Sequence, residues 1–269
     1  MNNRVQPSRQ DRAISVLGGP STVIDMGGLR IVADPTFDGP GAQGYLTKLT
    51  GPAASASDVG AVDAVLVSHD LHPDNLDTSG RAFALAAPVV LTGPVTAGRL
   101  GSPAIGLPTW GTHRLPRPDG EGELRVTAVP AVHGPEDGAR DADGHVNCEV
   151  TGFVLSGRGL PTVYVSGDNA SVRVVAEISR RIGRVDVAVL FMGAARVAAK
   201  EQGRPLTLTS ERGSAAAAVL GPAMVIPAHC DGWAHFSEGH AEITRAFGEA
   251  GLSDVLADPE HGEWIPLPR

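Results

Sequence analysis

The chain has 269 residues, of which 42% are hydrophobic, and this is enough apolar side chain to bury the core of one large domain. Its formal charge is -8 and its Lys and Arg residues are scattered along the sequence, so the composition argues against nucleic acid as a partner.

The opening segment MNNRVQPSRQDR is polar, and no later run is long and apolar enough to span a bilayer. We therefore expect a flexible polar tail over residues 1–12, a single domain over residues 13–269, no membrane partner and a cytoplasmic location. The two cysteines, Cys148 and Cys230, lack the spacing of a redox pair. Both are predicted to be small buried hydrophobic residues, Cys148 within a strand.

Short β-branched runs follow the tail and predict an antiparallel meander, with a hairpin turn at Gly27 and Gly28. The next run, AVDAVLVSHD, is almost continuously apolar, which is typical of a strand covered on both faces. Further strand patterns are PVVLTG, ELRVTAVPAV, CEVTGFVLSG, TVYVSGD, VDVAVLFMG and AMVIPAHC. Helices are predicted over residues 81–86, 96–100, 172–182, 210–220 and 241–250, with Gly221 as a helix cap. This alternation indicates the α/β class.

Histidine or aspartate side chains follow four of the predicted strands. They are residues 69–74, His133, Asp168 and His229. Because sites in α/β sheets form outside such strand ends, we expect these residues to converge. Neutral imidazoles and carboxylates are ligands for zinc and similar divalent ions, and a catalytic site keeps one position open for water. A metal can lower the pKa of such a water to about 7.

In their order along the chain these motifs resemble those of the metallo-beta-lactamase superfamily, in particular the branch that resembles ascorbate-phosphate lactonases. The family pattern is a strand leading into Thr/Ser-His-x-His-x-Asp-His, then a lone His, a Gly-Asp and a late His. The matching residues here are Ser68-His69, Asp74, His133, Asp168 and His229, and the opening STVIDMGGLRIVADPTFD resembles the family's first hairpin. The resemblance implies an αββα sandwich with a metal site at one rim, in a superfamily composed mostly of hydrolases.

Two positions depart from this pattern. The second histidine of the motif should be at position 71, which is Leu71, and His72 follows as though one residue were inserted. The last histidine of the motif is replaced by Asn75. An ungapped alignment would instead put Asp70 and His72 in the two histidine positions, but it loses the match at Ser68-His69, so we favour the insertion, with His72 reaching the metal from a shifted loop.

Leucine cannot bind a metal, and asparagine is a weak ligand beside imidazole. The resemblance then implies one tight metal site and a weakened second site. His69 and His133 belong to the first, with His72 and Asp168 as further candidates, and Asp74, Asp168 and His229 belong to the second. Asp74 is expected to orient water. His235 is expected to protonate a leaving group or hold an oxyanion, the alternative being a residue at a helix start.

The other polar residues near the motifs are predicted to have structural roles. Asp70 is expected to fix the tautomer of a histidine ring, and Asp34 to bond the loop backbone below the site. Asn75 and Asp77 are expected to make local hydrogen bonds. Cys230 adjoins His229 but should point to the opposite face of its strand. Surface positions are predicted for His113, His145, His240 and His261.

The prediction is a metal-dependent hydrolase that acts on a small-molecule ester, lactone or phosphoester with zinc or manganese. One alternative is a mononuclear non-haem iron oxygenase, since His69, His133 and Asp168 form a set of two histidines and one carboxylate, and some members of the family are thiol-persulfide dioxygenases. The other is a non-catalytic relative whose site has decayed. The sequence makes no prediction of oligomeric state.

Overall fold

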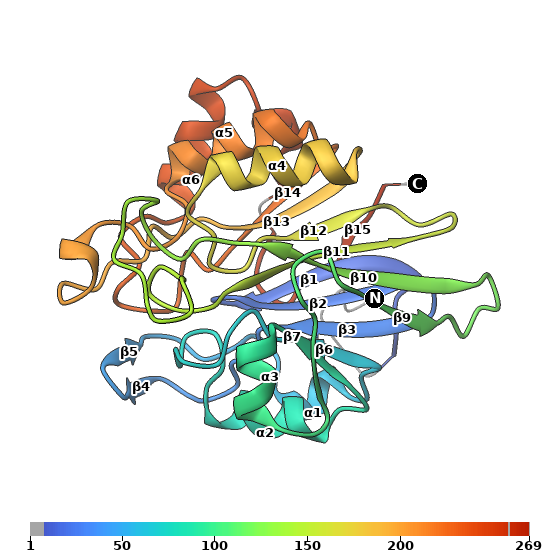
Figure 1. Cartoon of the computed structure of the whole chain (residues 1–269). Coiled ribbons are helices and arrows are strands. Elements are labelled where there is room, and N and C mark those ends of the chain that lie inside the picture. Colours follow the sequence, from blue (N-terminus) through green and yellow to red (C-terminus); the bar gives the residue numbers. More distant parts are fainter. Residues whose placement is uncertain (1–7, 258, 269) are drawn as a thin grey trace.

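Two β-sheets face one another across an apolar core, and helices cover the outer face of each sheet (Figure 1). The computed structural model describes residues 8–257 and 259–268. In Figure 1, α4 (Val172–Ile182), α5 (Ser210–Leu220) and α6 (His240–Glu249) lie above the sandwich. The helices α1 (Ala56–Val59), α2 (Thr78–Ala86) and α3 (Pro94–Leu100) lie below it. The predicted four-layer αββα architecture is confirmed.

The first sheet combines the predicted antiparallel meander with parallel strands. Gly27 and Gly28 have φ angles of 61° and 76° at the hairpin turn between β2 and β3, as the sequence predicts. The strands β6, β7 and β8 continue from β3 in parallel. In spatial order the strands are β15 (Ile265–Pro266), β1 (Arg12–Gly18), β2 (Ser21–Met26), β3 (Leu29–Ala33), β6 (Ala64–Leu66), β7 (Val90–Thr92) and β8 (Ala104–Gly106).

The second sheet carries the later strand ends. Its order is β14 (Met224–Ala228), β13 (Val187–Phe191), β12 (Val163–Val165), β11 (Thr151–Gly157), β10 (Glu123–Pro130) and β9 (Thr112–Pro116). The strands β12, β13 and β14 are parallel, so their carboxyl ends meet at one edge. A separate hairpin, β4 (Gly41–Gln43) with β5 (Leu46–Lys48), projects beyond this edge at the left of Figure 1.

Most helices begin where a side chain accepts a hydrogen bond from a backbone N–H of the first turn, or where a proline lacks that N–H. The Asp77 carboxylate accepts from Gly80 N, so α2 (Thr78–Ala86) begins before the predicted residue 81. Pro94 opens α3 (Pro94–Leu100) two residues before its predicted start. The predicted helices α4 (Val172–Ile182) and α5 (Ser210–Leu220) are confirmed, and α6 spans His240–Glu249. The short helix α1 (Ala56–Val59) and the 3-10 turns η1 (Glu201–Gly203) and η2 (Ser253–Val255) were not predicted.

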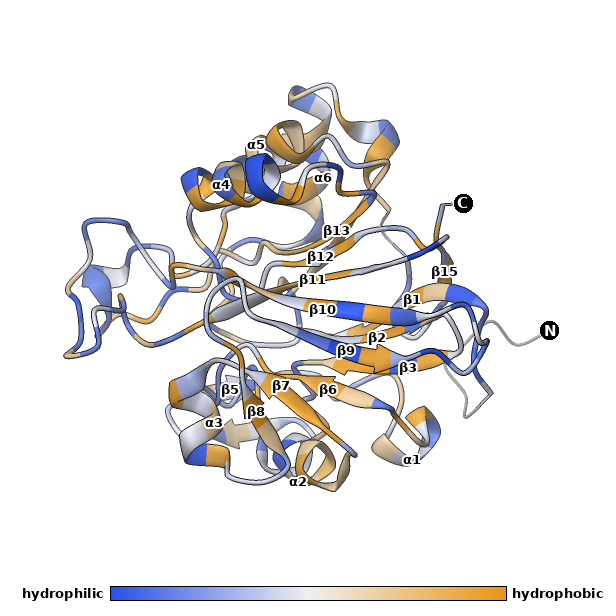
Figure 2. Ribbon diagram, turned by 45° about the vertical axis from the view of Figure 1, so that its right-hand side comes forward, coloured by the Kyte–Doolittle hydropathy of each residue, from blue (hydrophilic) through white to orange (hydrophobic). Residues whose placement is uncertain are grey.

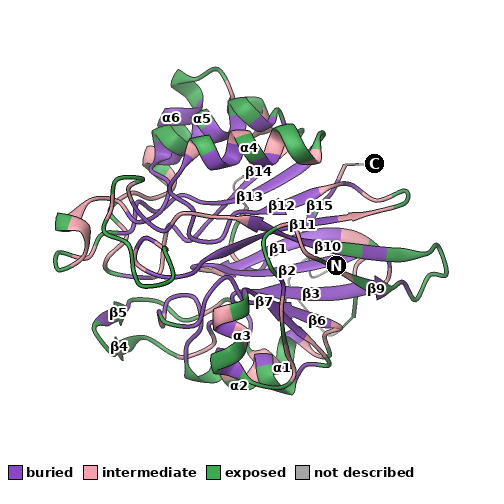
Figure 3. Cartoon of the chain, viewed as in Figure 1, coloured by how far each residue is buried: buried purple, intermediate pink, exposed green. Residues whose placement is uncertain are grey.

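The core lies between the sheets and is filled by their inward-facing aliphatic and aromatic side chains. In Figure 2 the central strands are largely orange, that is hydrophobic, and in Figure 3 they are buried while the outer faces of the helices are exposed. Burial of this apolar surface is the main stabilising term for such a sandwich. Among the described residues, no helix has the length and hydropathy needed to cross a bilayer.

One fully buried ion pair lies beneath the first sheet. The Arg30 guanidinium donates from Nε to Asp25 Oδ1 over 2.7 Å and from Nη2 to Asp25 Oδ2 over 2.6 Å. Gln10 N also donates to Asp25, and Arg9 contacts Gly28 O. The strand β1 begins at Arg12, inside the predicted tail, whose first seven residues lie outside the described part of the chain.

Candidate metal centre

The structure brings the six predicted ligands together at one edge of the sandwich, where the strands end in loops. The loop after β6 supplies His69, His72 and Asp74, and the segments after β10, β12 and β14 supply His133, Asp168 and His229. All six are buried, the most exposed being His72 at 6%. Parallel pairing of β12, β13 and β14 places Asp168 and His229 at one edge, and the loop after β6 of the facing sheet meets them there.

Three histidine rings form the first group of donors. His69 Nε2 lies 2.6 Å from His72 Nδ1, and His133 Nε2 lies 3.1 Å from the same atom. Two nitrogens that bind one tetrahedral zinc at 2.0–2.1 Å are about 3.3 Å apart. The observed separations are shorter than this, and three ring nitrogens gathered at one point fit a metal ion, because hydrogen bonding alone would leave lone pairs facing one another.

Burial keeps these histidines in the form that a metal needs. It lowers the pKa of His72 and of His133 to about 4, against the pull of Asp74 on His72 and of Asp168 on His133. Burial also lowers the pKa of His69, and the neighbouring His72 and His133 lower it further. All three rings are therefore neutral at neutral pH, as metal ligation requires.

The second group consists of Asp74, Asp168 and His229. His229 Nε2 lies 3.1 Å from Asp74 Oδ2 and 3.5 Å from Asp168 Oδ1. The other oxygen of Asp168 lies 3.5 Å from His133 Nε2, so this carboxylate faces both groups. Burial raises the pKa of Asp74, but hydrogen bonds from His229 and His235 outweigh it and hold that pKa well below its usual range. Asp74 Oδ1 is buried without a hydrogen-bond partner, as expected for an atom placed to bind a cation.

Backbone strain helps to aim His229 at the site. Its φ is 54°, a left-handed value that costs a non-glycine residue energy. The strand β13 is followed by Gly193, where a Cβ atom would lie 2.1 Å from His229 O. Only glycine therefore allows the backbone of His229 to approach so closely.

Leu71 does not occupy a ligand position. Its side chain is 50% exposed and lines a surface cavity of about 420 Å³ beside Tyr45 and Pro73, while His72 turns inward. The leucine therefore removes no donor from the first group. The prediction for Asp70 was wrong: its carboxylate binds Arg99 at 2.5 Å and Arg81 at 3.2 Å and contacts no histidine ring. These two arginines hold Asp70 away from the histidines.

Asn75 stands where the family pattern has a histidine beside the second group of donors. Its Nδ2 donates to Asp168 Oδ1 over 2.9 Å and approaches Asp34 Oδ2 at 3.4 Å. The prediction of a local hydrogen bond was wrong here, because Asn75 reaches across to another strand end. Asn75 orients the shared carboxylate but offers no imidazole nitrogen beside it.

Asn75→His is expected to raise the metal content by about one ion per chain, because it adds an imidazole beside Asp74, Asp168 and His229. The measurement is plasma mass spectrometry after equilibration with zinc and gel filtration. Leu71→His is the matched control, since it adds the same imidazole at a position that is 50% exposed and lines the surface cavity. Equal metal contents in the two variants would contradict the assignment of Asn75 to the second site.

The floor of the site is held by Asp34 and Asp77. Ser68 N donates to Asp34 Oδ1 over 2.6 Å, which confirms that Asp34 bonds the loop backbone, and burial raises the pKa of Asp34 to about 7. Asp77 does more than make local bonds. It accepts from Phe37 N, from Gly80 N and from Lys48 Nζ, and so ties the first loop to α2.

Three residues at the site were missed in the sequence. Cys148 was assigned to a strand, but β11 begins at Thr151, and the thiol lies within 4.8 Å of the donor atoms of His69, His72 and His133. Lys200 Nζ lies 2.7 Å from His72 Nε2, and its charge is 5.4 Å from the ring centre of Tyr45. No strand-end pattern marks Lys200 or Tyr45, so only the tertiary structure identifies them.

His235 lies in the loop before α6, so it is not a helix-start residue. Its Nε2 is 2.9 Å from Asp74 Oδ2, and its catalytic role stays a prediction. Two of the four histidines assigned to the surface, His240 and His261, are partly exposed and are also hydrogen-bonded to Asp231.

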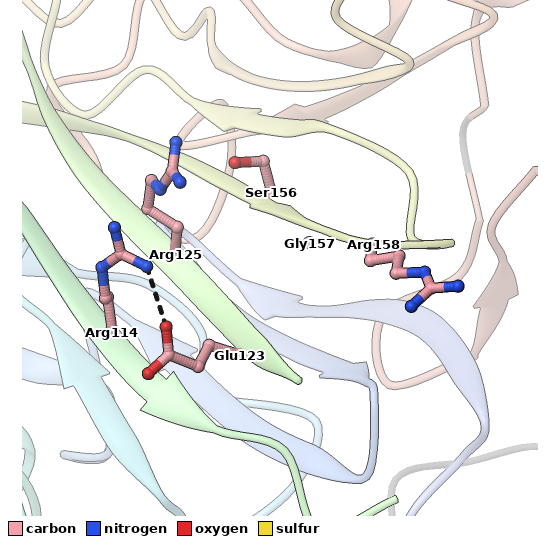
Figure 4. A pocket seen from close by; sticks show the side chains of 6 residues that line it. All are labelled: Arg114, Glu123, Arg125, Ser156, Gly157 and Arg158. Carbon is pink, nitrogen blue, oxygen red and sulfur yellow. Dashed lines mark hydrogen bonds and ion pairs between the residues drawn. The ribbon is translucent and has the colours of Figure 1, made fainter. Parts of the chain in front are cut away.

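A small cavity of about 10 Å³, roughly the room for one water molecule, adjoins the donors. Tyr45, Lys200 and His235 line it together with four of the predicted ligands: His72, Asp74, His133 and Asp168. A wider cavity of about 400 Å³ is lined by Arg114, Arg125 and Arg158 (Figure 4). It lies at the opposite ends of β10 and β11, where Arg125 pairs with Ser156, and contains none of the predicted ligands.

The metal-free protein should lose stability as the pH falls from 6.5 to 4. An unfolded chain takes up protons on His72 and His133 near their ordinary pKa of 6.5, whereas in the folded chain burial lowers both pKa values to about 4. The unfolded state therefore gains roughly 3 kcal/mol for each histidine across this interval, and below pH 4 the effect levels off. Thermal unfolding of chelator-treated protein from pH 8 to pH 4 checks this. A His133→Gln variant with an undiminished pH dependence would argue against it.

Comparisons with known proteins agree with this geometry. The profile of the Beta-lactamase superfamily domain matches residues 29–230. A UPF0173 metal-dependent hydrolase from Anaeromyxobacter dehalogenans is 29% identical over 207 residues, which are 74% of this chain and 65% of that protein. The chain thus spans about two thirds of the length of that relative. A UPF0173 metal-dependent hydrolase from Pyrococcus abyssi is 24% identical and is covered over 98% of its length, against 93% of this chain.

Among solved structures, isothiocyanate hydrolase from Delia radicum gut bacteria has the same fold. It superposes with a TM-score of 0.78 at 20% identity and covers 95% of this chain and 98% of its own. The αββα sandwich, the donors at its edge and the profile match over most of the sequence lead to one conclusion. The chain belongs to the metallo-beta-lactamase superfamily.

Proposed function

We propose that this protein is a metal-dependent hydrolase of a small-molecule ester, lactone or phosphoester. The observation that carries the proposal is the convergence of six buried histidine and aspartate side chains at one sheet edge. His69, His72, His133 and Asp168 would hold a tight zinc or manganese ion, and Asp74 and His229 would form the weaker position. A bound divalent metal supplies a Lewis acid and lowers the pKa of its bound water to about 7.

The side chains around the donors can orient a water molecule and donate a proton. His229 and His235 keep the Asp74 carboxylate ionised, so it can accept a hydrogen bond from a water molecule and orient it. The His235 ring borders the cavity and is 10% exposed, so it can reach a leaving group. We assign the proton donor role to His235 and the orienting role to Asp74.

Substrate size and charge are limited by the covering residues. The cavity beside the donors holds about one water molecule, so a substrate must displace the ring of Tyr45 and the ammonium group of Lys200. Tyr45 is 55% exposed on the β4–β5 hairpin and can move without disrupting the core. Lys200 favours an anionic group near the site, so phosphoesters and acidic lactones lead the candidates.

The iron oxygenase is the second candidate, and the histidine set gives zinc the preference over iron. That alternative required two histidines and one carboxylate, but His72 lies in the same group as His69 and His133, which makes three histidines. Catalytic zinc sites use three histidine ligands and keep a further coordination position open for water.

The test begins with elemental analysis of protein purified without chelator or histidine tag. The protein is then stripped, reloaded with zinc or manganese, and assayed on p-nitrophenyl acetate, an acidic γ-lactone and p-nitrophenyl phosphate. We expect hydrolysis of at least one probe that disappears on stripping and returns with metal. Iron in the purified protein would favour the oxygenase. Failure to retain zinc or manganese would contradict the proposal and favour a binding protein.

A further inference from the structure

A second group of potential ligands lies on the other side of the loop that follows β14. It consists of Cys230, Asp231, His240 and His261, here termed the Cys230 cluster. Its residues come from that loop, from the first turn of α6 and from the segment before β15. None of them lines the cavity at the catalytic donors.

The donor atoms of Cys230, Asp231 and His240 all lie within 4.8 Å of one another, and His261 contacts this group at Asp231. Cys230 Sγ lies 3.7 Å from His240 Nε2 and 3.9 Å from Asp231 Oδ2. His240 Nε2 and His261 Nε2 lie 3.1 Å and 2.9 Å from Asp231 Oδ2. The thiol is 3% exposed, whereas the His240 and His261 side chains are 36% and 32% exposed, so an ion could reach the cluster from solvent.

The two sulfur distances are close to the edges of a tetrahedral zinc site, and the nitrogen-to-oxygen distances are shorter than such edges. With zinc at about 2.3 Å from sulfur and about 2.0–2.2 Å from nitrogen and oxygen, sulfur lies about 3.6 Å from each N or O ligand. Nitrogen and oxygen ligands on the same ion lie about 3.4 Å apart. The three donors that converge are a thiol, a carboxylate and an imidazole, and the His261 imidazole on Asp231 is the candidate fourth. Zinc accepts this donor set and hard ions such as Mg²⁺ do not.

We propose that the Cys230 cluster is a second metal site, structural in type, that binds Zn²⁺ with four protein ligands. It would join three separated segments of the chain. Asp231 Oδ1 also accepts from Gly19 N over 3.1 Å, which adds the turn between β1 and β2 to the group. Because Cys230 directly follows His229, an ion here would also fix the strand end that aims His229 at the catalytic donors. The site is separate from the proposed catalytic function and does not depend on it.

The chain has only two cysteines, so cobalt spectroscopy can assign each one. Cobalt(II) bound to a thiolate gives a strong near-ultraviolet charge-transfer band that nitrogen and oxygen ligands do not give. The experiment loads Co²⁺ and, separately, Zn²⁺ into the unmodified chain and into Cys148→Ser, Cys230→Ser and His261→Ala. Cys148→Ser is the matched control, because its remaining thiol is Cys230. His261→Ala alters a side chain that is 32% exposed, so it tests the cluster without opening the core.

We expect Cys148→Ser to keep the thiolate-to-cobalt band at about one equivalent per chain. Cys230→Ser and His261→Ala should each bind about one zinc fewer than the unmodified chain, and zinc removal should lower the unfolding temperature of the unmodified chain more than that of His261→Ala. Absence of the band in Cys148→Ser would overturn the proposal. Unchanged zinc content in His261→Ala, whether or not Cys230→Ser folds, would overturn it as well.

The test of the second metal site does not require the protein to be catalytically active. His69→Ala removes a donor of the catalytic group and leaves the Cys230 cluster intact, so it should keep the second zinc. Failure of the proposed hydrolase function and failure of the second metal site therefore give different results.

Discussion

Replacement of His69 by alanine is expected to abolish hydrolysis and the tight metal of the catalytic group. The side chain is fully buried, and its Nε2 lies 2.6 Å from His72 Nδ1 within the three-histidine group. Loss of a residue that merely supports a metal ligand costs about 10–100-fold in metal affinity or activity. Loss of a ligand itself should exceed this range, and the reduction should appear in kcat as well as in metal content.

The measurement combines kcat/KM on the best probe with metal content by plasma mass spectrometry. His113→Ala is the matched control, because His113 lies on β9 and belongs to neither donor group. Circular dichroism shows whether each variant folds. If a folded His69→Ala chain kept both its metal and its activity, the catalytic site would have to lie elsewhere.

Replacement of Arg30 by methionine should destabilise the fold by about 3–5 kcal/mol, because it leaves the Asp25 carboxylate buried without its partner. Both side chains of this pair are 0% exposed, and two hydrogen bonds of 2.7 and 2.6 Å join them. The Arg30 Nη1 atom also donates to Val59 O over 2.6 Å, so the substitution removes a further bond near α1. Urea unfolding monitored by circular dichroism gives the change in free energy of unfolding.

Arg114→Met is the control for Arg30→Met. Arg114 pairs with Glu123 at 2.9 Å, but the two side chains are 57% and 47% exposed, so its loss should cost about 0–1 kcal/mol. The double variant Asp25→Leu/Arg30→Met should regain part of the stability lost in Arg30→Met, because no uncompensated charge remains. Equal losses in Arg30→Met and Arg114→Met would contradict this account of the buried pair.

The positions of three site residues could be predicted because each directly follows an apolar strand. His133, Asp168 and His229 come after β10, β12 and β14, and parallel pairing of β12 with β13 and of β13 with β14 places two of these ends at one edge. The local pattern thus determines where the chain leaves the sheet, and the sheet then determines which residues meet.

The loop between residues 68 and 77 could not be assigned in the same way. Sequence spacing places Asp70, Leu71 and His72 next to one another, but it does not say which side chain turns inward. Arg81 and Arg99 bind Asp70 from α2 and α3, Leu71 lies in solvent, and His72 joins the other histidines. These partners are distant in the sequence, so no local pattern contains them.

The surroundings of the two cysteines also could not be predicted from the local sequence. The apolar run that contains Cys148 predicted a strand around it, yet β11 begins three residues later and the thiol enters the histidine group instead. Cys230 and His261 are 31 residues apart in the sequence and meet around Asp231 because the chain returns to add β15 beside β1.

The sequence by itself determined the alternation of strands and helices, the αββα architecture that its motifs imply, and the strand ends that carry histidine and aspartate. Hydrophobic periodicity and strand-end position are local properties, so they can be read along the chain. Only the tertiary structure decided that Asp70 binds two arginines, that Asn75 holds Asp168, and that Lys200 and Cys148 border the donors. Each of these depends on side chains packed from distant segments, whose directions are set by burial and by long-range hydrogen bonds.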